Sequence, residues 1–327
     1  MATAALSLNA TESFAQTATT LRFGSHAPAP SAMVKDGLAV MLKNIERDAG
    51  GSLKIEDYWG GALIKAPDKQ YEALLNGIQQ ATMVFPAYTE ALFPDFSLFN
   101  LPFLFKSGEE ATTVAWKMHE AGLLRGLEKV KLLSIFCSPP AGMFLARRET
   151  AISAVHGKRI QGGGPTEAKI IEAMGGAAVA MSVAQAPEAL SQRLIDGCQT
   201  SWTGIASFKV IRLLKTFIDM PLGQSVYFAA ISKEFYDSLP EAARAGIDKN
   251  SGLQESLRMA TVLHEEADRS KQQARTTAGA VVIKPEATSQ EYKDLETKFR
   301  VFHTDWIGKT PDGQKKFDTA LQLLGRS

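Results

Sequence analysis

A glycine-rich turn followed by proline is the stretch of this chain whose backbone could hold a ligand. Gly162, Gly163 and Gly164 follow a short apolar run, and Pro165 stands where a helix would begin. Proline suits the first position of a helix because its missing N–H would have no helical partner there. The free N–H groups of such a turn and helix start attract anions. On its own the turn is a weak signal for an anion site.

Catalytic and metal-binding patterns are weak by comparison. The five histidines are scattered, and no two have the spacing with which a helix binds a metal. The sequence has no GxSxG elbow, no P-loop and no GxGxxG at the start of a helix. The adjacent carboxylates Glu109-Glu110 and Glu265-Glu266 would not face each other on a helix, so they indicate solvated surface. We therefore expect no catalytic residue, no metal and no cofactor.

The glycine turn is positioned by alternating strands and helices between His156 and Trp202. Apolar stripes and glycine stops predict strands before Gly162, over 177–181 and over 198–202, with a helix in each gap. Such strands form a largely parallel sheet, whose ligands lie at the carboxyl ends of the strands. Residues 161–165 and 200–202 occupy that end. We therefore expect them to lie together at a binding site.

Length and composition are those of a globular protein with room for two domains. The chain has 327 residues, of which 45% are hydrophobic and 22% charged, and its net charge is +1. It has no basic run with interleaved aromatics, so we expect no nucleic-acid partner, and no stretch apolar enough to span a bilayer. Cys137 and Cys198 each lie in an apolar, strand-like run, and we expect two buried free thiols rather than a bridge.

Several stretches resemble one family over nearly the whole chain. They are GKRI-x-GGGP, AMGGAAVAMSVAQAPEAL and LIDG in the central region, WGGAL near the start, and FPDFSLFNLPFLF after Tyr88. These stretches resemble the DctP-type solute-binding proteins of tripartite ATP-independent periplasmic (TRAP) transporters. The resemblance implies an α/β, two-lobed periplasmic binding protein fold. Each lobe would be a mixed, mainly parallel sheet flanked by helices, with a long helix spanning both lobes.

The expected lobe boundaries follow from two crossings of the chain. We assign residues 21–138 and 227–267 to lobe I, and residues 139–226 and 268–327 to lobe II. A helix from Glu241 to about Thr277 would be about as long as the protein is wide, so it should cross both lobes.

Residues 1–20 are read as a truncated signal-like or disordered segment. They are rich in small residues but lack the basic start and the long apolar core of an intact secretory signal. The family resemblance favours a periplasmic location over a cytoplasmic tail.

The resemblance also puts the carboxylate clamp of the family in doubt. In the family an arginine just before the glycine turn usually forms a bidentate pair with the ligand carboxylate. The matching residue here is Gln161, and a second family arginine falls on Met143 or Phe144. Three explanations stay open. Backbone N–H groups with the Gln161 amide could hold the anion, or a neighbouring arginine could reach the cleft, or the ligand could be neutral. The neighbouring arginines are Arg147, Arg148 and Arg159.

The remaining candidates for the cleft are mostly aromatic. Thr200 matches a family asparagine, and Trp202 follows it where the family places cleft residues. His26, at the end of the first strand, is a candidate hydrogen-bond donor. A buried structural role competes with the cleft for each of them, and core packing is favoured for Phe99, Phe103 and Phe105. The candidates for the cleft wall are Phe85, Tyr88, Tyr227, Trp59 and Trp202.

Taken together, the sequence predicts a periplasmic, monomeric receptor that performs no chemistry. It would bind a small organic ligand, a carboxylate or an aromatic compound, between its lobes and deliver it to TRAP membrane subunits. Binding of this kind needs a cleft that excludes water and a few convergent polar groups. The alternatives are an ABC-type periplasmic receptor, a receptor for a neutral ligand, and a periplasmic enzyme. A long helix across both lobes would favour the TRAP type over the ABC type.

Overall fold

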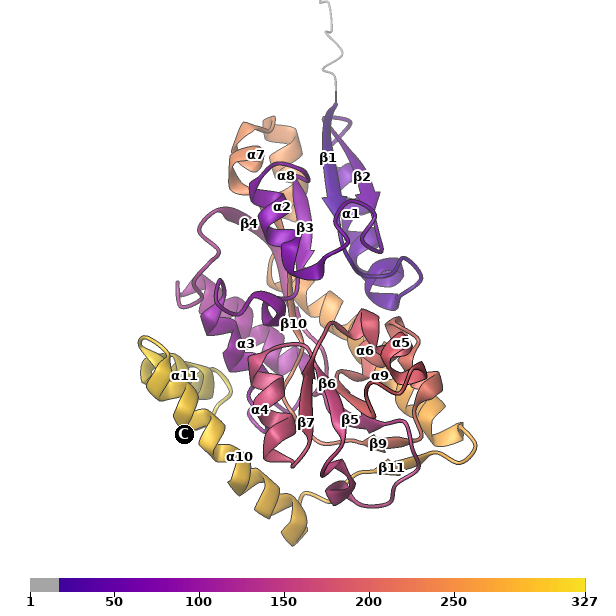
Figure 1. Cartoon of the computed structure of the whole chain (residues 1–327). Helices are drawn as coiled ribbons and strands as arrows, with labels where there is room; N and C mark the ends of the chain where they lie inside the picture. Colours follow the sequence, from indigo (N-terminus) through magenta and orange to yellow (C-terminus); the bar gives the residue numbers. More distant parts are fainter. Residues whose placement is uncertain (1–17, 327) are drawn as a thin grey trace, which may run out of the picture.

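Two separate β-sheets give the structure its two lobes (Figure 1). The computed structural model describes residues 18–326. The signal-like segment predicted over residues 1–20 therefore lies outside the described residues, except for its last three. The predicted α/β, two-lobed architecture is confirmed.

Lobe I contains a five-stranded sheet in the order β2-β1-β3-β10-β4. Strand β1 pairs in parallel with β2 and β3, and only β10 runs against its neighbours. The strands are β1 (Thr19–Gly24), β2 (Leu53–Tyr58), β3 (Ala81–Val84), β4 (Val130–Cys137) and β10 (Val226–Ser232). Its helices are η1 (Met33–Leu38), α1 (Ala39–Asp48), η2 (Pro67–Lys69), α2 (Gln70–Leu75), η3 (Pro86–Thr89), η4 (Pro94–Asn100), α3 (Gly108–Glu120) and α7 (Lys233–Ser238).

Lobe II contains a six-stranded sheet in the order β11-β9-β5-β8-β6-β7, in which only β5 is antiparallel to its neighbours. The strands are β5 (Gly142–Leu145), β6 (Arg159–Gly162), β7 (Ala177–Ala180), β8 (Gly197–Thr200), β9 (Thr216–Ile218) and β11 (Val281–Ile283). Its helices are η5 (Ile152–Val155), α4 (Pro165–Ala173), η6 (Val183–Gln185), α5 (Ala186–Ser191), α6 (Trp202–Ser207) and η7 (Val210–Leu213).

Three local expectations differ from the structure of lobe II. Strand β7, predicted over 177–181, ends at Ala180 and is the edge strand, with residues that are partly or fully exposed. Strand β8 ends at Thr200 rather than at Trp202, because Ser201 caps the next helix by accepting a hydrogen bond from the Gly204 N–H. The buried strand β5, a four-residue apolar run, was not predicted as a strand.

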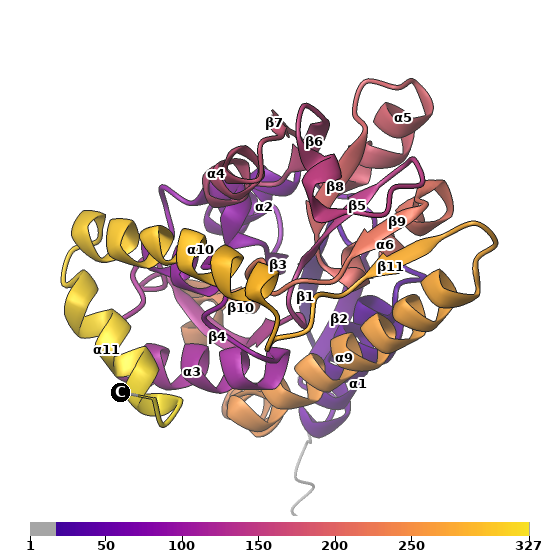
Figure 2. The same ribbon diagram turned by 90° about the horizontal axis from the view of Figure 1, so that it is seen from below.

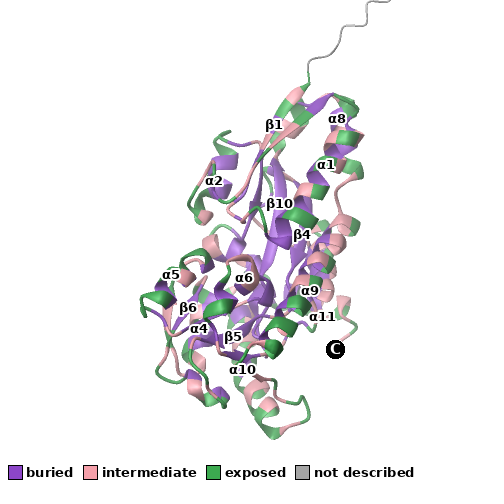
Figure 3. Cartoon of the chain, turned by 90° about the vertical axis from the view of Figure 1, so that its right-hand side faces the viewer, coloured by how far each residue is buried: buried purple, intermediate pink, exposed green. Residues whose placement is uncertain are grey.

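The two lobes are joined by neighbouring chain segments that form a hinge. The first segment links β4 to β5, and the second links β9 to β10. Ser138 donates its N–H to the Ser225 carbonyl at 2.8 Å, and Ala141 donates its N–H to the Gly223 carbonyl at 2.7 Å. The central strands around this hinge are buried, whereas the outer helix faces are exposed (Figure 3). Cys137 and Cys198 are both buried and free, as predicted.

A long helix spans both lobes, but it is shorter than predicted. The segment expected to be one helix from Glu241 is divided into α8 (Glu241–Lys249) and α9 (Leu253–Thr276). The break falls at Gly252, whose φ of 104° is a conformation that favours glycine. Helix α9 packs on α3 and β4 in lobe I and on α6 and β11 in lobe II. Its 24 residues extend about 36 Å. Among the helices of residues 18–326, none is apolar enough over a sufficient length to cross a bilayer.

The C-terminal helices α10 (Gln290–Lys309) and α11 (Gly313–Leu323) return from lobe II to lobe I (Figure 2). Phe299 of α10 is buried in a lobe II cluster with Met143, whereas the Trp306 N–H donates to Ser97 of lobe I. Helix α11 packs on α3. The structure therefore differs from the predicted assignment of all of 268–327 to lobe II.

A buried ion pair fixes α11 to lobe I. Asp95 is fully buried and accepts hydrogen bonds from Lys316 of α11 and from Arg125, the latter at 2.7 Å. Burial alone would raise the pKa of Asp95, but the hydrogen bonds from the two cations outweigh it and lower the pKa.

Candidate functional site

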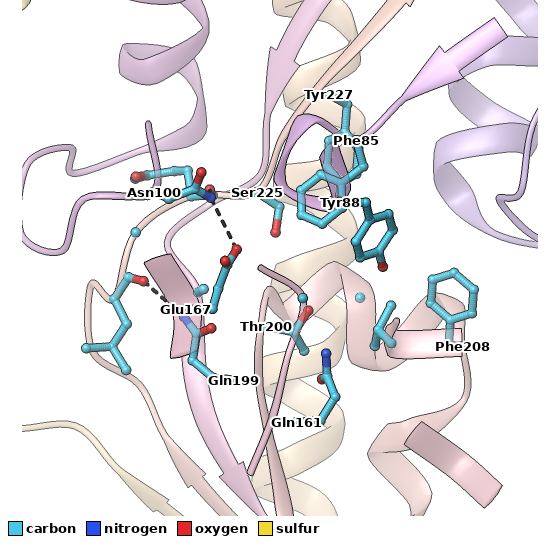
Figure 4. Close-up of a pocket in the computed structure, with 17 residues that line it drawn as sticks. Phe85, Tyr88, Asn100, Gln161, Glu167, Gln199, Thr200, Phe208, Ser225 and Tyr227 are labelled. Carbon is cyan, nitrogen blue, oxygen red and sulfur yellow. Dashed lines mark hydrogen bonds between the residues drawn. The ribbon is translucent and has the colours of Figure 1, made fainter. Parts of the chain in front are cut away.

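A cavity of about 40 Å³ lies between the lobes at the hinge (Figure 4). Its walls come from both lobes and from the hinge segments that join them. Lobe I contributes Phe85, Tyr88, Asn100 and Tyr227, and lobe II contributes residues of β6, β8, α4 and α6. A lining of aromatic side chains with a few polar groups is typical of sites that bind small organic molecules.

Six of the ten residues predicted for the site line this cavity: Phe85, Tyr88, Gln161, Gly163, Thr200 and Tyr227. They are brought together because β6 and β8 are parallel neighbours whose carboxyl ends face lobe I. This is the arrangement expected for ligand sites of parallel sheets.

The two predicted residues Trp202 and Met143 lie inside lobe II. Trp202 is fully buried, stacks on Phe217 with ring centroids 5.5 Å apart, and donates its indole N–H to Asp219 at 2.9 Å. Met143 is fully buried in a cluster with Phe299. Both side chains therefore belong to the hydrophobic core of lobe II and not to the cleft.

The other two predicted residues, Trp59 and His26, lie in lobe I outside the cavity lining. The Trp59 ring packs on Phe23, and its N–H donates to Asp57 at 2.9 Å. His26 lies behind the cavity wall, with its ring centroid 6.0 Å from that of Tyr88. Burial lowers the pKa of His26 to about 4, so the imidazole is neutral at pH 7.

The aromatic wall of the cavity belongs to lobe I. The Phe85 and Tyr227 rings are stacked with centroids 5.0 Å apart, and Tyr88 meets Phe85 edge to face at 4.7 Å. Burial raises the pKa of both tyrosines, so their hydroxyls are neutral. These rings offer a flat apolar surface with hydroxyl groups at its edge, and Phe208 of lobe II stands beyond Tyr88 (Figure 4).

The glycine turn lies where lobe II meets lobe I. A Cβ added to Gly163 would be 3.3 Å from the Tyr88 ring, and one added to Gly164 would be 2.5 Å from the Ala87 carbonyl oxygen. Gly164 has an extended backbone with φ −154°, which any residue can adopt. Glycine is therefore required here for the close approach of the lobes rather than for its backbone conformation.

Three glutamines that line the cavity share one arrangement. Each donates its amide N–H to a main-chain carbonyl: Gln161 to Met181 at 2.9 Å, Gln199 to Leu222 at 3.1 Å, and Gln224 to Phe105 at 3.2 Å. Each leaves its buried Oε1 without a hydrogen-bond partner. Gln199 and Gln224 were not predicted, although a polar residue within an apolar strand, as in GCQT, is a signal that could have indicated Gln199.

Glu167 is the ionisable residue of the cavity that the sequence analysis missed. It lies in the first turn of α4, directly after the glycine turn, and it is buried. Burial raises its pKa to about 7. Asn100 donates its amide N–H to Glu167 Oε1 at 3.4 Å, whereas Oε2 has no partner. Its position at the carboxyl end of β6 was the available signal.

The neighbouring arginines lie away from the cavity. Arg159 pairs with Asp196 at 3.1 Å at the opposite end of β6, and Arg147 and Arg148 are exposed. Among the described residues that line the cavity, none is lysine, arginine or histidine. The carboxyl of Glu167 is therefore the one acidic or basic side chain among them, apart from the tyrosine hydroxyls.

Two lobes that enclose a cavity at a double-stranded hinge define a solute-binding protein. A family model described as bacterial extracellular solute-binding protein, family 7 (DctP) matches residues 23–305. The chain therefore belongs to this family.

Known relatives agree with this assignment. The C4-dicarboxylate-binding periplasmic protein DctP of Rhodobacter capsulatus is 24% identical over 288 residues, which cover 86% of this chain and 84% of that protein. A TRAP solute-binding protein from Rhodoferax ferrireducens T118, in complex with copurified benzoate, has a TM-score of 0.87 at 24% identity, covering 94% of this chain and 98% of the other. A marine metagenome TRAP solute-binding protein specific for aromatic acid ligands, in complex with metahydroxyphenylacetate, has a TM-score of 0.87 at 22% identity, with the same coverage.

Proposed function

We propose that this chain is a periplasmic, monomeric receptor that captures a small organic acid between its lobes and delivers it unchanged to TRAP membrane subunits. The observation that carries the proposal is the cavity at the hinge, with an aromatic wall from one lobe and polar groups from the other. Membership of the extracellular solute-binding family supports the receptor role and the location.

The ligand we propose is a flat carboxylic acid. The rings of Phe85, Tyr88 and Tyr227 give the ligand an apolar, aromatic wall, against which an aromatic group would pack favourably. The related proteins that hold benzoate and metahydroxyphenylacetate support an aromatic acid. The carboxylate would meet main-chain N–H groups of the glycine turn and hydroxyl donors instead of the family arginine.

Identification of the natural ligand tests the proposal. Denaturing mass spectrometry of the purified protein should release a copurified organic acid, and a thermal-shift panel of acids should raise the melting temperature, since a ligand of the folded state stabilises it by mass action. Gln161→Ala should weaken binding. The carboxylate is refuted if acids are inert while neutral aromatics shift the melting temperature. Chemical conversion of a bound compound would refute the receptor role.

A further inference from the structure

Four residues that line the cavity carry a buried hydrogen-bond acceptor without a partner among residues 18–326. The four unpartnered oxygens are Oε1 of Gln161, Gln199 and Gln224 and Oε2 of Glu167. The side chains that carry them are nearly inaccessible, with exposed fractions of 1%, 2%, 2% and 8%. Buried polar atoms are nearly always hydrogen-bonded, so four such oxygens around one cavity indicate a partner that comes from outside the chain.

The orientation of the three amides is fixed by their surroundings. Each NH₂ group donates to a main-chain carbonyl, which can only accept. Turning an amide over would place two oxygens against each other and lose the bond. The carbonyl oxygens are therefore held as acceptors.

When Glu167 is ionised it adds a negative charge to these acceptors, and no lysine, arginine or histidine among the described lining residues balances it. The charge of Glu90 in lobe I adds to the raised pKa of Glu167, and Lys169 of the same helix lies beside Glu90 rather than in the cavity. The hydroxyls of Tyr88 and Tyr227 and the amide of Asn100 are the other polar groups that face it. Figure 4 shows Glu167 reaching toward Asn100 and Ser225, away from the aromatic wall.

The inference from these observations rests on the proposed function and specifies the class of ligand. We infer that the cavity selects organic acids that carry an additional N–H or O–H donor, which the carboxyl of Glu167 and the carbonyl oxygens of Gln199 and Gln224 accept. The flat part of the ligand lies against Phe85, Tyr88 and Tyr227. An acid without such a donor leaves buried acceptors unsatisfied and brings its own negative charge to Glu167, so it binds more weakly.

Calorimetric titration of matched compounds tests this selection in the wild-type protein. The probes are benzoate, 3- and 4-hydroxybenzoate, and 3- and 4-aminobenzoate at pH 8. We expect at least one donor-bearing acid to bind about 10- to 100-fold more tightly than benzoate, which is the range for one hydrogen bond to a charged group. This comparison requires no variant.

Two variants assign the selection to Glu167. Glu167→Leu should reduce the preference for the donor-bearing acid to less than about threefold, and the isosteric Glu167→Gln should reduce it in part. Glu172→Gln, on the exposed face of the same helix, is the matched control and should keep the wild-type preference. Circular dichroism and gel filtration establish that each variant is folded.

The outcomes separate the two proposals. Benzoate binding as tightly as every hydroxy and amino acid of the panel overturns the selection and leaves the receptor for aromatic acids intact. An undiminished preference in both folded Glu167 variants also overturns it. Failure of every compound to bind, together with absence of a copurified acid, refutes the proposed ligand class and the selection together.

Discussion

Substitution of Gly164 by alanine should prevent the lobes from closing. The added methyl group would lie 2.5 Å from the Ala87 carbonyl oxygen, whereas an unstrained contact is about 3.5 Å. Lobe I and lobe II would have to separate by about 1 Å at this point, or the cavity would stay open. Overpacking of this kind costs about 1–3 kcal/mol, so we expect ligand affinity to fall about 5- to 150-fold.

The effect should be confined to ligand binding, because Gly164 and Ala87 belong to different lobes. The melting temperature of the ligand-free variant should stay close to that of the wild type. Gly163→Ala should have a smaller effect, since its methyl group would meet the Tyr88 ring at 3.3 Å. Gly308→Ala is the matched control, because nothing lies within 4 Å of its Cβ position.

Calorimetric titration with the tightest-binding benzoate derivative measures the affinity, and small-angle X-ray scattering measures compaction on ligand addition. The wild type and Gly308→Ala should become more compact, and Gly164→Ala should not. Unchanged affinity and unchanged compaction in Gly164→Ala would refute the view that the glycine turn is the closing contact.

Three further predictions concern stability. The pKa of Glu167 is about 7 in the folded protein against 4.5 in an unfolded chain, so the folded protein loses stability as pH rises through this range. In urea unfolding, Glu167→Gln should therefore be more stable than the wild type at pH 8, by up to about 3 kcal/mol, and equal to it at pH 4.5. A difference that stays constant with pH would contradict the raised pKa. Lys316→Met leaves the buried Asp95 with one cation, and unfolding should cost about 3 kcal/mol less, whereas the exposed Lys315→Met should change little. Trp202→Ala should lower the free energy of unfolding by about 3–5 kcal/mol, more than Trp59→Ala, and equal losses would argue against its place in the lobe II core.

The sequence predicted the elements whose signals are local. The apolar, strand-like run that contains Cys137 forms strand β4, because a continuous apolar run between polar turns has few alternatives. Strand β5 was missed for a related reason, since its four residues are too few to show a period. The interruption at Gly252 was also missed, because the apolar face continues through the break.

The candidate site was predictable in position but not in polarity. The carboxyl ends of β6 and β8 gave Gln161, Gly163 and Thr200 from topology alone. Trp202 was predicted with them because the predicted strand continued past Ser201, which instead caps helix α6. Gln224 lies in a hinge segment and became a site residue only when the two lobes met around it, and such a contact leaves no trace in spacing.

The C-terminal helices also have a mechanical consequence. Helices α10 and α11 return to lobe I and so connect the two lobes, in addition to the two hinge segments and α9. Phe299 is buried in lobe II and Trp306 is bonded to Ser97 of lobe I, and both belong to the continuous helix α10. The length of helix between these two contacts would thus limit how far the lobes separate.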